Sequence, residues 1–67
     1  MTPRTYTWTG DRAVSDRGAV LGVVSESATL PGRWWGGVRG PKWAEATRAD
    51  AVAAVDRVLA RRGWGRA

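Results

Sequence analysis

The side chains best suited to chemistry in this sequence form a basic strip near its centre. The strip consists of Arg33, Trp35, Arg39 and Lys42. No Asp or Glu occurs between Glu26 and Glu45, so no carboxylate neutralises the strip locally. Cationic groups beside a flat aromatic ring can contact phosphates and base edges, or stack on an exposed base. The strip therefore indicates a surface that binds nucleic acid or another acidic partner.

Trp35 also has a purely structural interpretation. Its ring could cover the far side of a sheet as a second small core, with arginine stems packed over it. A large exposed tryptophan, by contrast, is typical of an interface. Both alternatives stay open at the level of sequence.

The remaining arginines divide into two groups. Arg12 and Arg17 lie in the predicted turns at 10–12 and 15–18, and we assign them to the same binding surface as the strip. A second basic cluster comprises Arg61, Arg62 and Arg66, with no acid after Asp56. These cations either complement the negative end of a helix dipole or clamp a phosphate.

Composition argues against several classes of function. The chain has neither cysteine nor histidine, which excludes disulfides, thiolate metal sites and Cys/His or Ser/His nucleophile pairs. The six carboxylates are scattered through predicted turns and the outer face of a helix, with no pair placed for acid–base work. We therefore expect no enzyme activity, no metal site and no cofactor.

The charge balance favours acidic partners. Eleven Lys and Arg residues face six Asp and Glu residues, a formal net charge of +5. Lys42 is the only lysine among them, and so strong a preference for arginine tracks GC-rich codons. Part of the basic bias is therefore explained by codon usage rather than by function.

These residues must be positioned by helices and strands. The length and pattern of the sequence predict a single small α+β domain over residues 1–67. Tyr6 and Trp8 alternate with threonines in a strand over 5–9, and β-branched residues predict a central strand over 19–25. A strand over 33–39 places Trp34 and Val38 on one face and the strip residues on the other. Residues 42–46 either form a fourth strand or lead into a helix, and 63–67 form a tail.

The best-specified element is an amphipathic helix over 48–62. Thr47 and Asp50 resemble a capping box, and Gly63 suits a left-handed cap. Its apolar stripe consists of Ala51, Val52, Val55, Val58 and Leu59, and Asp56 falls off that stripe. The predicted fold is a β-β-β-α arrangement: a three-stranded antiparallel sheet, four-stranded if 42–46 pairs, with this C-terminal helix on one face. Tyr6, Trp8 and Trp34 are the predicted core aromatics.

The order of the central elements is a strand over 20–25, then the segment Arg33-Trp-Trp-Gly-Gly-Val-Arg39, then a helix that opens at Thr47. This order resembles the AP2-type DNA-binding domain and the arm-binding domains of phage integrases. The resemblance covers residues 19–62. It implies that the sheet face opposite the helix enters the major groove. On this basis Arg33, Trp35 and Arg39 would contact DNA, while Trp34 and Val38 would face the helix.

Two functions follow as expectations. The first is a small basic module, of phage or mobile-element type, that binds duplex DNA with its helix-free sheet face. The alternative is a protein-binding module, such as a phage-encoded inhibitor of a host enzyme or a small subunit of an assembly, since Trp and Arg are enriched at interface hot spots. A homodimer stays open. No apolar run is long enough for a signal peptide or a membrane span, so we expect a cytoplasmic protein without membrane contact.

Overall fold

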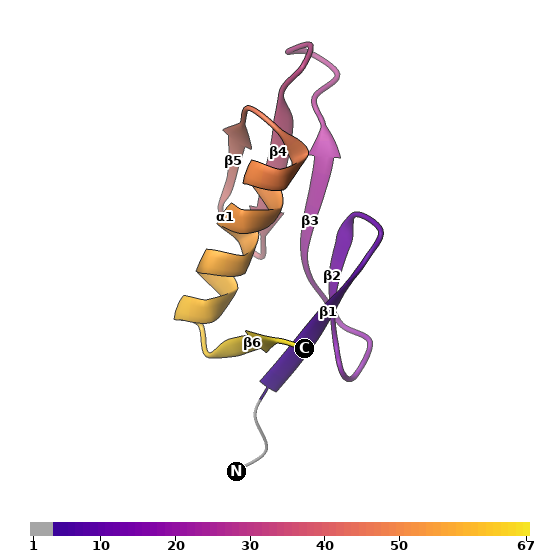
Figure 1. The fold of residues 1–67 in the computed structure, drawn as a ribbon, viewed down its shortest axis with the longest axis vertical. Coiled ribbons are helices and arrows are strands. Elements are labelled where there is room, and N and C mark those ends of the chain that lie inside the picture. The colour runs from indigo at the N-terminus through magenta and orange to yellow at the C-terminus, as the bar shows by residue number, and fades with distance from the viewer. Residues whose placement is uncertain (1–3) are drawn as a thin grey trace.

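The computed structural model describes residues 4–67 as one six-stranded sheet and one helix (Figure 1). The strands are β1 (Arg4–Thr9), β2 (Arg12–Ser15), β3 (Val20–Glu26), β4 (Trp34–Val38), β5 (Lys42–Glu45) and β6 (Trp64–Arg66), and the helix is α1 (Arg48–Arg61). The strand order is β5-β4-β3-β2-β1-β6. The sheet curls into an open half-barrel around α1.

The first five strands form an antiparallel meander, and β6 joins β1 in parallel. The backbone N–H of Ala67 donates to the carbonyl of Tyr6 at 2.8 Å, which extends this pairing past β6. The predicted three- or four-stranded antiparallel sheet is therefore wrong in strand number and in strand direction. Residues 42–45 do pair, and both Arg12–Ser15 and Trp64–Arg66 are strands as well.

The two strands missing from the prediction are short. Strand β2 holds only four residues between two turns, and β6 holds three residues in the segment predicted to be a tail. A segment of this length shows no periodic pattern of its own. Each is a strand because a neighbouring backbone lies beside it, which is a property of the whole fold.

The helix begins and ends within one residue of the predicted bounds. The Thr47 hydroxyl accepts a hydrogen bond from the Asp50 backbone N–H at 3.1 Å, which satisfies one of the free donors of the first turn. Gly63 follows the helix with φ of 89°, the left-handed conformation expected of a residue just past the last turn. Among residues 4–67, α1 is the one helix, and its 14 residues are too few and too polar to cross a membrane.

One face of α1 packs across β3, β4 and β5, and the helix also contacts β6 (Figure 1). The buried core consists of Tyr6, Ala13, Val24, Ala51, Val55 and Leu59. Trp8, Trp34 and Trp43 are half-buried and pack against it. The core therefore lies between the helix and the concave side of the sheet, and the other side of the sheet is left without a helix.

Two strand glycines let α1 approach the sheet closely. A Cβ on Gly22 would lie 2.7 Å from Cγ1 of Val55, and a Cβ on Gly36 would lie 3.2 Å from the Ala51 carbonyl oxygen. A side chain at either position would push the helix away from the sheet. The glycines that weaken these strands locally therefore permit the packing that forms the core.

Candidate nucleic-acid interface

Apart from Asp16, the acidic side chains of the protein lie away from the helix-free face of the sheet. Asp11 pairs with Arg48 at 3.0 Å, and Asp50 and Asp56 are on α1. Glu45 is opposite Trp34 in the β4–β5 register, and facing residues share a side of the sheet. Glu26 is also opposite Trp34, which packs against the core. Asp16 lies in the turn after β2.

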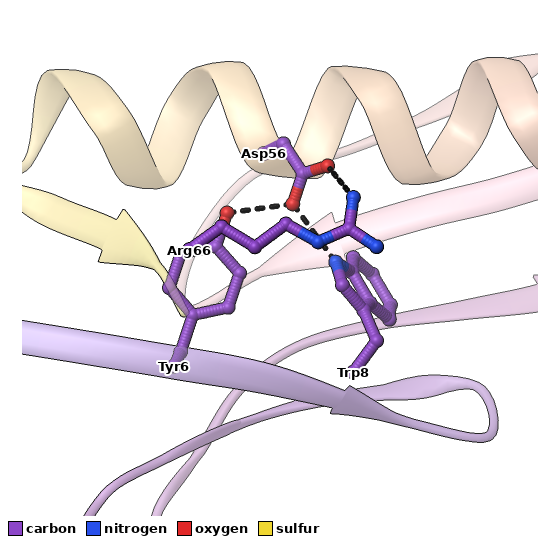
Figure 2. Close-up of polar contacts among 4 residues, drawn as sticks. All are labelled: Tyr6, Trp8, Asp56 and Arg66. Carbon is purple, nitrogen blue, oxygen red and sulfur yellow. Dashed lines mark hydrogen bonds and ion pairs between the residues drawn. The ribbon is translucent and has the colours of Figure 1, made fainter.

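Asp56 is the main exception to the sequence analysis, which placed it on the outer face of the helix. Figure 2 shows its carboxylate pointing at β1, where Oδ1 accepts from the Tyr6 hydroxyl at 2.6 Å and from Trp8 Nε1 at 2.8 Å. Its Oδ2 accepts from Nη1 of Arg66 at 3.1 Å. This Asp56 cluster, defined by these four residues, ties α1 to β1 and β6. Because both carboxylate oxygens have protein partners, the arrangement is structural.

A signal for this cluster does exist in the sequence. Asp56 lies four residues after Val52 and three before Leu59, so it borders the apolar stripe rather than opposing it. Tyr6 and Trp8 each carry a polar hydrogen that needs an acceptor once the ring is buried. A carboxylate at the border of the stripe is the group that could supply one.

The same cluster makes the stability of the protein sensitive to alkaline pH. Burial, followed by the hydrogen bond to Asp56 and its negative charge, raises the pKa of Tyr6 from 10.0 to about 12. Well below pH 10 the phenol is protonated in both the folded and the unfolded protein, and its full contribution to the free energy of unfolding is present. Between pH 10 and 12 the unfolded chain loses the proton before the folded protein does, so the free energy of unfolding falls.

We expect a loss of about 2 to 3 kcal/mol over this interval, from 1.36 kcal/mol per pKa unit. Urea denaturation at closely spaced pH values, followed by circular dichroism, would measure it. In the Tyr6→Phe variant the fall should be smaller by this amount, because no phenol titrates there. An equal fall in both proteins would contradict the assignment.

The helix-free face carries a continuous row of facing residues. Thr9 is opposite Arg12, Arg12 opposite Val23, Val23 opposite Gly37, and Gly37 opposite Lys42. The side of this row is set by its neighbours, since Ala13, Gly22 and Val24 face the core. With strands about 4.8 Å apart, Arg12 and Lys42 are separated by about 14 Å. Two cations therefore flank an apolar centre.

Trp35 and Arg39 complete this face around the row. Trp35 lies two residues before Gly37, and the Lys42 ammonium is 6.0 Å from the centre of its ring, a cation–π geometry. Arg39 follows β4 and, with Lys42, lines a shallow groove of about 320 Å³ whose other walls include Val23 and Gly37. Among the described strands, no carboxylate falls on this face.

The predicted site residues are only partly brought together. Trp35, Arg39, Lys42 and Arg12 share the helix-free face. Arg33 ends the loop before β4, where its carbonyl accepts from the Ser27 N–H at 2.8 Å. Arg17 lies in the turn between β2 and β3 and lines a separate pocket beside Asp16 and Trp64.

The second basic cluster is dispersed over three places. Arg66 pairs with Asp56, and Nη1 of Arg62 donates to the Arg39 carbonyl at 3.2 Å. Arg61 lines a cleft between α1 and β5. The prediction treated these side chains as one surface because they are close in sequence, but the Arg62 side chain is bonded to the Arg39 carbonyl and the turn into β6 carries Arg66 away to Asp56.

Sequence reasoning missed the apolar part of the helix-free face. Val23 and Val20 are 42% and 53% exposed, which is high for valines in a central strand. A continuous β-branched run predicts burial on both faces, and one of those faces turns out to be uncovered. In residues 4–67 no three carboxylates come close enough together to hold a metal ion.

Comparison with known proteins adds no family to this description. No protein family, curated protein or solved structure matches the chain. The functional argument therefore depends on the chemistry of the helix-free face.

Proposed function

We propose that the helix-free face of the sheet binds nucleic acid, with duplex DNA as the preferred form. The observation that carries the proposal is the acid-free row in which Arg12 and Lys42 flank Val23 and Gly37, with Trp35 and Arg39 beside it. In this proposal the protein acts in the cytoplasm as a binding module without catalytic chemistry.

The dimensions of the row suit a duplex. The estimated 14 Å between Arg12 and Lys42 is close to the major-groove width of about 12 Å, so both cations can reach the phosphates that border the groove. In this proposal Arg39 approaches base edges, and the β1 threonines that alternate with Tyr6 and Trp8 donate their hydroxyls to phosphate oxygens. Three antiparallel strands, β3 to β5, are backed by α1 in this part of the fold, the layout that prompted the resemblance to AP2-type domains.

Binding should be measured by fluorescence anisotropy with a random duplex of about 20 base pairs over a series of salt concentrations. We expect affinity to fall steeply with salt and tryptophan emission to change on binding. Arg12→Ala with Lys42→Ala should weaken binding about tenfold or more and make the log–log salt slope shallower by about 2, because two phosphate contacts are lost.

A control pair of equal charge is available on α1. Arg57→Ala with Arg61→Ala also lowers the net charge by two, but these residues line the cleft on the other side of the sheet. If this pair weakened binding as much as the first pair, the helix-free face would not be the site. Absence of binding at low salt would reject the proposal as a whole.

A protein partner on the same face is the second candidate, and the exposed Val20 and Val23 beside Trp35 favour it. An apolar centre with a basic rim is typical of a protein interface. The salt series separates the two functions. Binding centred on Trp35 and the valines should persist at about half-molar salt, where phosphate-driven binding is lost.

A further inference from the structure

The open edge of β5 lies beside α1, and the cleft between them is on the helix side of the sheet. Strand β5 ends the sheet on one side, and α1 contacts it (Figure 1). Between them is a cleft of about 220 Å³. Its lining consists of Trp43, Glu45, Ala54, Arg57, Val58 and Arg61. A sheet edge beside a helix is a geometry in which an extended peptide can add as a further strand.

The outward backbone groups of β5 can be assigned from its register with β4. The N–H of Val38 donates to the Pro41 carbonyl at 3.1 Å, so this facing pair is hydrogen-bonded. Bonded and non-bonded pairs alternate along an antiparallel ladder. The pairs that contain Lys42 and Ala44 are therefore non-bonded, and the N–H and C=O of these two residues point outward from the edge.

The side chains of the cleft select the kind of peptide that fits. Trp43, Ala54 and Val58 provide an apolar floor. Arg57 and Arg61, one helical turn apart and both exposed, form a cationic rim, and they outnumber Glu45, the one carboxylate of the lining. Within residues 4–67 the ion pairs are Arg48–Asp11 and Arg66–Asp56, so neither rim arginine is engaged.

We propose that the cleft between β5 and α1 binds an extended acidic segment of a partner protein. The segment adds to the sheet as a strand on Lys42 and Ala44, places an apolar side chain against Trp43, and sets carboxylates on Arg57 and Arg61. A second copy of this chain is a poor occupant. Pairing β5 with β5 would bring Arg57 and Arg61 of one copy towards those of the other, four cations against two Glu45 carboxylates, in a protein of net charge +5.

The test uses a capped, tryptophan-free peptide of about seven residues in which Glu, Val and Glu occupy alternate positions with Thr between them, so that both acids and the apolar residue face the cleft. It is titrated into the whole protein while tryptophan emission is followed. We expect saturable binding. The same peptide with Lys in place of Glu should not bind. Methylation of alternate peptide nitrogens should weaken binding at least about tenfold, because it removes the strand hydrogen bonds and leaves every charge in place.

Matched variants connect the binding to the cleft. Arg57→Ala with Arg61→Ala should weaken the peptide about tenfold or more, whereas Arg12→Ala with Arg39→Ala removes the same charge from the other face and should change it less than about twofold. Circular dichroism would establish that each variant is folded. Equal effects of the two pairs, equal binding of the methylated peptide, or a peptide-free dimer in sedimentation equilibrium would overturn the proposal.

This proposal and the nucleic-acid proposal can fail separately. Duplex binding depends on Arg12 and Lys42, and peptide binding depends on Arg57 and Arg61. Both ligands can therefore be measured on the same variants. Loss of one activity with retention of the other identifies which surface has been affected.

Discussion

Asp56→Ala is expected to remove most of the stability of the protein. Tyr6 and Trp8 would each lose a charged acceptor, and such hydrogen bonds contribute about 1.5 to 3 kcal/mol apiece. The expected loss is thus roughly 3 to 6 kcal/mol. A domain of this length has a free energy of unfolding of roughly 3 to 10 kcal/mol, so this loss is a large fraction of the total.

Urea denaturation followed by circular dichroism and tryptophan emission would measure this effect. Asp50→Ala is the matched control, because it removes the same group from the same helix but contacts neither Tyr6 nor Trp8. It should lose only about 0.3 to 1 kcal/mol through the helix dipole. Asp56→Asn should fall between the two, since it keeps one acceptor oxygen. If Asp56→Ala and Asp50→Ala were equally stable, the Asp56 cluster would not hold the helix to β1.

Gly22→Ala is expected to lower the free energy of unfolding by about 2 to 3 kcal/mol, in the range of core overpacking. The new methyl group would lie 2.7 Å from Cγ1 of Val55 and 3.1 Å from the Gly37 carbonyl oxygen. Val55 is fully buried and short, so it has no room to move aside. The helix must shift away from β3 to relieve the contact.

A double-mutant cycle with Val55→Ala would test this explanation. Val55→Ala alone should lose about 2 kcal/mol or more by leaving a cavity. The double variant should be more stable than the sum of the two losses predicts, because the methyl group at position 22 then fills part of that cavity. Gly65→Ala, in β6, is the control, since the nearest neighbour of its new methyl group would be the Arg4 carbonyl oxygen at 3.7 Å, an ordinary contact distance. Strict additivity would show that the two side chains do not meet.

Local patterns predicted the helix and three strands, and left a fourth open at 42–46, because each predicted element carries its own signal. Thr47, Asp50 and Gly63 mark the helix ends, and the alternation of Tyr6 and Trp8 marks β1. Strand β6 could not be predicted in this way. Trp64–Arg66 pairs with Arg4–Tyr6, residues at the other end of the described chain, and no short-range pattern reports such a partner.

The candidate site was likewise predictable from local patterns only in part. The alternation that separates Trp34 from Trp35 depends on period two and could be derived from the sequence. The presence of Arg12 on the same face as Lys42 required knowledge of three registers across four strands. The separation of Arg66 from Arg61 and Arg62 depended on a chain reversal at Gly63, where the sequence suggested only a helix cap.

The parallel pairing of β6 with β1 has a consequence for how the protein folds. Strands β1 to β5 join through short hairpin connections, so each pairing closes a small loop and can form early. The β1–β6 pairing instead joins the two ends of the described chain and closes the longest loop, so we expect it to form after the meander and α1. If the rate-limiting barrier is crossed before this edge closes, substitutions in β6 will speed unfolding and leave the folding rate nearly unchanged.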